Sequence, residues 1–222
     1  MVGKTEKERV RGYLKSTRKK IKYVYHDKEK YFGIERYFTI ILLITRFFSV
    51  ISLLRCSVIN KYLTLKICIE VWVVLKPLIL FILLCINIEE NIRFYIASYF
   101  LFDLFSVLFN LVYLRDLNSE AISYNRNLIL LNFNFAELVL GFSNIYYSNN
   151  SLIANCEKVH SWVDYVYFSL ATSTSVGYGD MTTTDKPTAI IQMFLSFIFI
   201  AIVFSTYISR REEKSIELRK DT

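Results

Sequence analysis

The chain has 222 residues, of which 54% are hydrophobic and 21% charged, with a mean hydropathy of +0.34 and a net charge of +7. A positive mean hydropathy with so few charges is typical of a membrane protein and disfavours an ordinary soluble domain. The basic residues gather mainly at the two ends beside apolar segments, so the clustered face of a nucleic-acid-binding protein is missing and we expect no nucleic-acid partner.

The chain begins with a polar, basic arm over residues 1–37. A secretory signal peptide would show an apolar run soon after its charges and small residues at a cleavage site, and the long basic arm lacks this cleavage signature. We therefore predict a solvated cytoplasmic arm that lies near anionic lipid headgroups.

Five apolar runs follow the arm, and each is close to the roughly 20 residues that a helix needs to cross the hydrocarbon. The runs are 38–57, 67–88, 94–114, 128–148 and 187–209. Because they are apolar nearly all round, they lack the polar face of a helix in a soluble bundle. The predicted fold class is therefore an all-α, multi-pass membrane protein.

Charged residues inside the first run raise the question of a voltage sensor, which would carry a positive charge at every third position of one helix. Arg46 and Arg55 are nine residues apart and fit this spacing, but Ser49 and Ser52 fill the two steps between them. The ladder is incomplete, which disfavours a sensor.

Charges within membrane runs can instead pair with one another. We favour internal pairing of Arg46 or Lys76 with Glu70 or Asp103 over voltage sensing.

A shorter segment, SWVDYVYFSLAT at 161–172, lies between the fourth and fifth runs. It is aromatic, amphipathic and too short to span a bilayer. Short helices and irregular backbone at membrane depth survive only inside protein or against water, because lipid cannot satisfy free N–H and C=O groups. The order of helix, short helix, glycine segment and helix therefore predicts a pore loop.

The glycine segment is TSTSVGYGD, residues 172–180. Glycine permits backbone angles that are closed to residues with a Cβ, so residues 176–179 can run extended with successive carbonyls aimed at one axis. Four copies around a symmetry axis would stack rings of oxygen that replace the water around a dehydrated cation. A phosphate-binding loop is disfavoured, since no Lys-Ser/Thr pair follows the glycines and no strand precedes them.

The motif TSVGYGD, which follows an aromatic-rich short helix between two membrane helices, resembles the signature filter of potassium channels. The resemblance covers about residues 128–209. It implies an outer helix over 128–148, a pore helix over 161–172, a filter over 174–180, an inner helix over 187–209 and a tetrameric pore.

Residues 38–127 match no motif of the family, and we expect them to supply two or three further transmembrane helices. Residues 210–222 would form a short cytoplasmic tail, too short to hold a ligand-binding gating domain. In this compact form the chain looks like the small channels of microbes and their viruses.

The resemblance implies that K+ is bound by the backbone carbonyls of Ser175, Val176, Gly177 and Tyr178 and by the hydroxyl of Ser175, with no other cofactor. Ser175 stands where the family usually has Thr and keeps the hydroxyl group. The predicted ion-binding residues of the filter are Thr174, Ser175, Val176, Gly177, Tyr178 and Gly179.

Three further positions follow from the resemblance. Asp180 matches an acid behind the outer mouth, and Tyr167 matches the aromatic donor that often bonds to it, so the pair would support the filter. Ala171 stands where some members carry a buried Glu. Phe199 occupies the place of the usual hinge glycine, and the run 187–209 has neither Gly nor an internal Pro, which disfavours a glycine-hinged opening.

The topology leaves two alternatives open. The pore loop must enter from outside, which makes residues 115–127 and the basic residues after 209 cytoplasmic, as the positive-inside tendency asks. Three spans before the outer helix would then place the basic arm outside. Either the first run lies at the interface or re-enters the membrane, or the N-terminus is external.

The function that these features predict is passive, potassium-selective conduction by a homotetramer in contact with membrane lipids, in the plasma membrane. With no filled charge ladder and no hinge glycine, we expect a background or weakly voltage-dependent conductance. The main alternative is a non-conducting or modulatory subunit that assembles with other pore-forming chains; a weakly selective cation pore and a potassium transporter are less favoured.

The cysteines and histidines predict neither an enzyme nor a metal site. The four cysteines are widely spaced without a C-x-x-C pair, three of them lie in apolar runs, and the two histidines have no partner at ligand spacing.

Overall fold

A computed structural model describes residues 33–48, 62–86, 88–113, 124–154, 157–158, 161–177 and 180–220. Its elements in chain order are α2 (Ile34–Phe48), α4 (Tyr62–Cys85), α5 (Glu90–Tyr113), α6 (Tyr124–Ser148), β1 (Leu152–Ala154), β2 (Glu157–Lys158), α7 (Trp162–Thr174), β3 (Met181–Thr183) and α8 (Lys186–Lys220). They divide into two compact units, one made of residues 1–72 and 105–120 and the other of residues 73–104 and 121–222.

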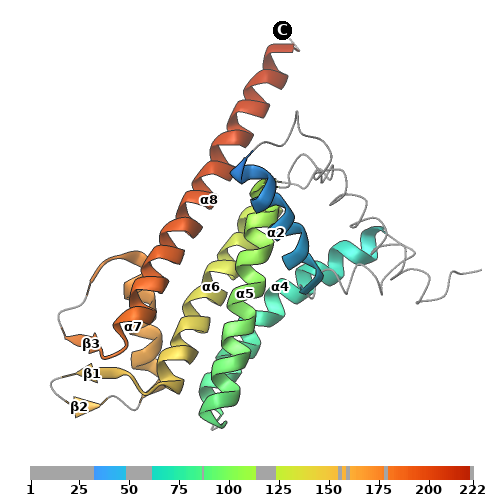
Figure 1. Ribbon diagram of the computed structural model, residues 1–222. Coiled ribbons are helices and arrows are strands. Elements are labelled where there is room, and N and C mark those ends of the chain that lie inside the picture. The colour runs from blue at the N-terminus through green and yellow to red at the C-terminus, as the bar shows by residue number, and fades with distance from the viewer. Residues whose placement is uncertain are drawn as a thin grey trace, which may run out of the picture. The chain divides into compact units, whose positions relative to one another are not determined.

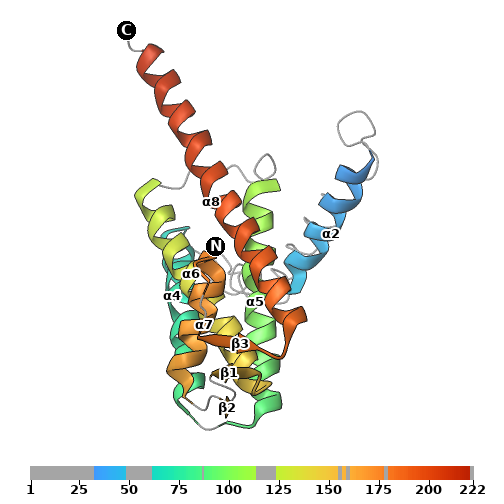
Figure 2. The ribbon, with the colours of Figure 1, turned by 90° about the vertical axis from the view of Figure 1, so that its left-hand side faces the viewer.

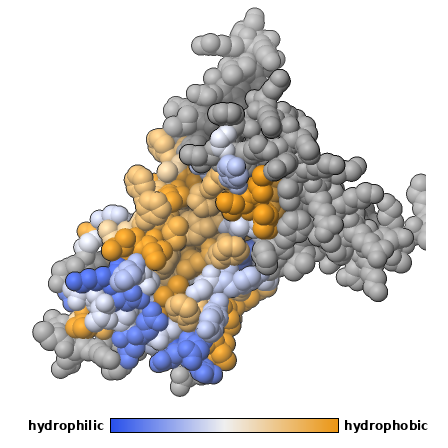
Figure 3. Space-filling view, viewed as in Figure 1, coloured by the Kyte–Doolittle hydropathy of each residue, from blue (hydrophilic) through white to orange (hydrophobic). Residues whose placement is uncertain are grey.

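In the described residues, four helices are long and apolar enough to cross a membrane. These candidate spans are Ile67–Cys85, Glu90–Asn110, Ile129–Ser148 and Lys186–Phe204. They coincide with four of the predicted apolar runs and confirm the prediction of a helical, multi-pass membrane protein. Figure 3 shows hydrophobic side chains over the middle of the helices and hydrophilic ones at the end that carries the strands.

The first unit is built around α2 and the last turns of α5. Leu42 and Leu43 are buried, and the ring of Phe38 meets Phe109 and Tyr113 edge-on at centroid distances of 6.1 and 5.0 Å. The structure describes the first predicted run only as far as Phe48. Residues 49–57, which include Arg55, lie outside the described residues.

The second unit contains the predicted pore module. Helix α7 lies beside α6 and α8 at the end of these helices where the strands are, as Figures 1 and 2 both show. The rings of Tyr146 and Phe168 join α6 to α7 at 5.2 Å, and those of Phe135 and Phe199 join α6 to α8 at 5.7 Å. Because lipid is as apolar as these side chains, close packing and polar contacts, rather than the hydrophobic effect, hold such helices together.

One glycine of α6 makes room for a side chain of α5. A Cβ built on Gly141 of α6 would lie 2.7 Å from Leu101 Cδ2 and 2.8 Å from Leu101 Cγ of α5. Glycine at this position therefore leaves room for the Leu101 side chain of α5 against the backbone of α6.

A small antiparallel sheet, which the sequence did not predict, joins the two ends of the pore loop. Its strand order is β2-β1-β3, and β1 pairs with β3 from Leu152↔Thr183 to Ala154↔Met181. The N–H of Thr184 continues the pairing by donating to the Ser151 carbonyl at 2.8 Å. Strands of two or three residues are too short to show an alternating pattern, which explains why the sequence gave no sign of them.

Candidate functional site

The predicted pore helix is present as α7, which has 13 residues. At about 1.5 Å per residue it is roughly 20 Å long, well short of the ~30 Å hydrocarbon thickness. Its buried residues are Tyr165, Phe168, Ser169, Ala171 and Ser173. A short helix with such a buried face is held within protein, as a re-entrant segment must be.

The chain leaves α7 through a tight left-handed cap. Ser175 has φ 56° and ψ 24°, its N–H donates to the Thr172 carbonyl at 3.3 Å, and the Val176 N–H donates to the Ala171 carbonyl at 3.2 Å. These two bonds form a Schellman motif, which satisfies carbonyls that the end of the helix would otherwise leave free. Gly177 follows with a second positive φ of 71°.

The predicted filter residues are only partly described. Thr174 lies in the last turn of α7 rather than beyond it, with its hydroxyl donating to the Leu170 carbonyl at 2.9 Å. Ser175, Val176 and Gly177 are exposed on the single chain. Tyr178 and Gly179 lie outside the described residues, so the full set of predicted ion ligands stays a prediction.

The predicted support for the filter also stays a prediction. Tyr167 is 37% exposed on α7 and Asp180 is exposed just before β3. Ala171, at the place where some potassium channels carry a buried Glu, is buried, and through its carbonyl it accepts the cap bond from Val176.

A buried polar network joins α7 to α8 and α6, and the sequence analysis did not predict it. The Gln192 side-chain amide of α8 lies 2.8 Å from the carbonyl and Oγ of Ser169 and from Ser173 Oγ, and it accepts a hydrogen bond from the Tyr146 hydroxyl of α6 at 2.8 Å. All four residues are fully buried. The signal in the sequence was an isolated Gln within an apolar run.

The start of α8 is capped by Asp185, two residues after β3. The carboxylate accepts from the Thr188 N–H at 3.2 Å, from the Thr188 hydroxyl at 2.6 Å and from the Asn149 amide at 2.9 Å. Burial alone would raise the pKa of Asp185, but these hydrogen bonds stabilise the charged form and hold its pKa below the ordinary value.

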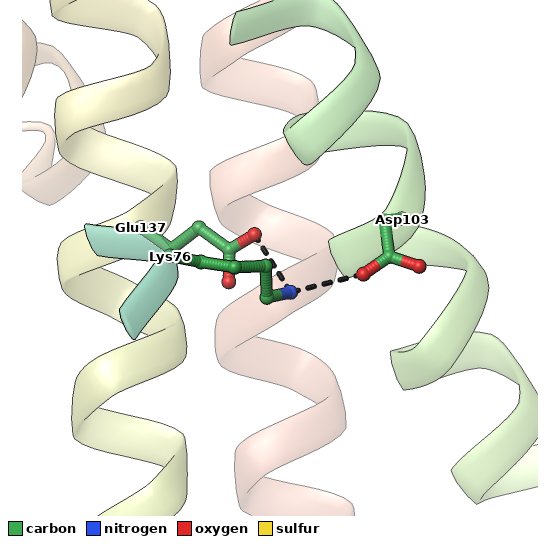
Figure 4. Close-up of polar contacts among 3 residues, drawn as sticks. All are labelled: Lys76, Asp103 and Glu137. Atoms are coloured by element: carbon green, nitrogen blue, oxygen red, sulfur yellow. Dashed lines mark hydrogen bonds and ion pairs between the residues drawn. The ribbon is translucent and has the colours of Figure 1, made fainter. Parts of the chain in front are cut away.

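Lys76 is paired inside the membrane part, as predicted. Its Nζ lies 3.1 Å from Asp103 Oδ2, which confirms one of the predicted internal pairs, and 2.8 Å from Glu137 Oε1 (Figure 4). Sequence reasoning missed Glu137, although an acid in the fourth apolar run was a visible signal. Three helices, α4, α5 and α6, thus meet at one charged cluster.

This cluster is not fully satisfied among the described residues. The Glu137 carboxylate is close enough for an ion pair but not aligned for a hydrogen bond, and Asp103 Oδ1 has no hydrogen-bond partner there either. Two carboxylates therefore share one ammonium group, and all three side chains are at most 2% exposed. Removing the lysine would leave two buried acids facing each other.

The inner helix runs without interruption past the predicted hinge position. Helix α8 is continuous from Lys186 to Lys220, and Phe199 is buried against Phe135 of α6. Its side chain therefore contributes to packing with the outer helix.

Comparisons with known proteins agree with this geometry. Residues 135–212 match the model of a family described as ion channel. Over 58 residues the chain is 34% identical to the potassium channel protein kcv of Paramecium bursaria Chlorella virus 1, a match that covers 25% of this chain and 62% of the viral protein. The chain thus spans less than two thirds of the length of that relative, and no solved structure matches. These matches confirm the resemblance to the potassium channel family.

Proposed function

From the ion channel module that residues 135–212 match, we propose that this chain conducts potassium ions passively and selectively across a membrane. The observation that carries the proposal is that TSVGYGD begins in the last turn of the half-buried helix α7 and contains its left-handed cap, between the candidate spans Ile129–Ser148 and Lys186–Phe204. Backbone carbonyls in this position would replace the hydration shell of K+. The C-terminal end of α7 adds the negative end of a helix dipole on the same side.

A homotetramer in the plasma membrane completes the proposal, because one chain supplies a single pore loop. The single chain leaves large apolar side chains of α8 exposed, and these would contact neighbouring copies or lipid. They include Ile190, Ile191, Met193, Phe194, Phe197 and Ile200.

We further propose a background conductance that varies little with voltage. The Lys76 ammonium is buried between two carboxylates at 3.1 and 2.8 Å, so it is poorly placed to move through the field as a gating charge.

The test is ion flux from liposomes that contain only this chain. We expect flux with a potassium gradient and far less with a sodium gradient of the same size. Equal fluxes of the two ions would contradict the proposed selectivity. Flux that appears only when another pore-forming chain is present would instead indicate a modulatory subunit.

A further inference from the structure

We propose that Gln192 is the positioning residue of the filter: it ties the pore helix α7 to both the inner and the outer helix, and so fixes where the filter begins. The inference rests on the proposed channel function. Gln192 itself need not touch an ion, because it acts through the last two turns of α7.

The donor end of the amide holds the pore helix at two points on one face. Nε2 of Gln192 lies 2.8 Å from the carbonyl oxygen of Ser169, 2.8 Å from Ser169 Oγ and 2.8 Å from Ser173 Oγ. Ser169 and Ser173 are one helical turn apart, so both lie on the side of α7 that faces α8. The amide therefore fixes the rotation of α7 as well as its distance from α8.

The orientation of the amide is determined by its neighbours. The hydroxyl of Ser169 donates to the Val139 carbonyl at 2.8 Å, so both Ser169 oxygens can only accept from Gln192. The opposite orientation would place the amide oxygen against a carbonyl oxygen at this distance, which is repulsive. Oε1 therefore faces α6, where it accepts from the Tyr146 hydroxyl at 2.8 Å.

This arrangement requires a side chain with a donor at one end and an acceptor at the other. Glutamine supplies both, whereas a carboxylate has no N–H and an aliphatic side chain has neither. Because Gln192 and its three partner residues are fully buried, no water is at hand to replace a lost bond. Gln192 is thus matched to this position by chemistry and not only by volume.

The network lies directly behind the start of the filter. Ser173 is two residues before Ser175, at which the backbone turns left-handed, and the cap bond from Val176 returns to Ala171 between the two braced serines. A rotation of the last turn of α7 would therefore carry the carbonyls of Ser175 and Val176 with it. Rings of carbonyls discriminate between ions by their spacing and number, so we expect such a rotation to lower selectivity.

The experiment compares potassium and sodium permeability in liposomes for the full chain and two matched variants. Gln192→Met keeps the approximate length of the side chain and removes both the amide donor and the amide acceptor of Gln192. Asn144→Met is the control, because Asn144 is also a fully buried amide and also bonds across helices, to the Leu80 carbonyl at 3.0 Å, while its amide donates to no described residue of α7. Thermal unfolding of each variant in detergent reports the loss of stability.

We expect Gln192→Met to lower the ratio of potassium to sodium permeability by about tenfold, the order of effect of one lost buried hydrogen bond. Asn144→Met should lose comparable stability and keep the ratio. The inference is overturned if both variants keep the ratio, or if both lower it in proportion to their loss of stability.

A milder variant covers the case in which Gln192→Met does not assemble. Tyr146→Phe removes a single O–H, keeps the ring against Phe168 and leaves Oε1 of Gln192 unpaired. We expect it to lower the ratio as well, and to add nothing when combined with Gln192→Met, since both act through the same amide. The proposed role of Gln192 is contradicted if Tyr146→Phe leaves the permeability ratio unchanged, or if the effects of Tyr146→Phe and Gln192→Met on that ratio are fully additive. Absence of potassium flux from the unsubstituted chain is a different result, because it removes the proposed function and this inference with it.

Discussion

Two residues of the proposed filter, on either side of Val176, hold backbone angles in the left-handed region. Ser175 has φ 56° and Gly177 has φ 71°. Only glycine takes such angles without a steric cost, and a residue with a Cβ loses roughly 1–2 kcal/mol. Ser175 has a Cβ and therefore carries this conformational strain. Such strained backbone is common where its conformation serves a function.

Replacing Gly177 by alanine should abolish potassium flux. A Cβ at this position would meet no atom within 4 Å in the single chain, so the effect is conformational and recurs in every copy of a tetramer. Liposome flux measures it. Gly33→Ala is the matched control, because Gly33 also has a positive φ of 60° with nothing within 4 Å and lies outside the pore module. Selective flux in Gly177→Ala would contradict the assignment of this backbone as the filter.

The cap at Asp185 predicts a dependence of stability on pH. Hydrogen bonds hold the folded-state pKa of Asp185 below its ordinary value, so the carboxylate contributes stability above the unfolded pKa of ~3.9. This contribution is lost as pH falls through the folded pKa. We expect the thermal stability of the full chain in detergent to fall below about pH 4 partly through this group.

Two substitutions separate the charge of Asp185 from its role as a cap. Asp185→Ala should lose about 0.5–2 kcal/mol near neutral pH, because the Thr188 N–H loses its acceptor. Asp185→Asn keeps an acceptor and should weaken the acid-dependent loss. Identical pH profiles for the full chain and Asp185→Asn would show that other groups cause that loss.

At the scale of helices, the cluster of Lys76, Asp103 and Glu137 joins α4, α5 and α6. Lys76→Met should destabilise the protein by about 3–5 kcal/mol, because it leaves two buried carboxylates without a cation. Adding Asp103→Asn and Glu137→Gln should recover much of the loss, since no unpaired charge then remains. Thermal unfolding in detergent measures both steps.

An exposed lysine provides the control for this experiment. Lys186 lies at the start of α8 and is exposed, so Lys186→Met should change stability by less than about 0.5 kcal/mol. If Lys76→Met were equally harmless, the cluster would have no role in holding the three helices together.

The contact of α6 with α5 at Gly141 gives a second prediction at this scale. Gly141→Ala should cost about 1–3 kcal/mol, because its Cβ would fall 2.7 Å from Leu101 Cδ2 and displace the Leu101 side chain from its packed position. Shortening the neighbour, in the combination Gly141→Ala with Leu101→Ala, should relieve the clash. A double variant less stable than the sum of the two single variants would contradict this packing.

Sequence reasoning found the helices more readily than their contacts. The length of the apolar runs was enough to predict four of the spans, and a charge in such a run was enough to predict that Lys76 has an internal partner. Glu137 and Gln192 stand out in the sequence as polar residues in apolar runs. A run that is apolar nearly all round does not tell which face turns inward, so the partners of these two side chains could not be derived. These contacts depend on how helices distant in the sequence pack together.

For the whole molecule, we expect open probability to vary little with membrane voltage. One elementary charge that crosses the full field contributes about 2.3 kcal/mol per 100 mV, so a few moving charges would give a steep curve. Lys76 forms ion pairs with two buried carboxylates, which oppose its movement through the field. The Arg46 side chain and the whole of Arg55 lie outside the described residues. Recordings from planar bilayers should give a shallow curve that Arg46→Gln and Arg55→Gln leave unchanged. A steep curve that flattens in Arg46→Gln would identify the first run as a sensor.

The pairing of β1 with β3 has a consequence for how the length of the loop between these strands can vary. Ala154 and Met181 are paired across the sheet. The segment between them, which contains α7 and the proposed filter, is therefore a loop whose two ends are held together by the strands. In a chain closed at its base, extra length is inexpensive: each doubling of a flexible stretch costs only about 0.6 kcal/mol. Residues inserted between β2 and α7 would lengthen this loop while the register of β1 and β3 stays the same. Length and charge can therefore vary in this segment without changing the strand pairing at its base.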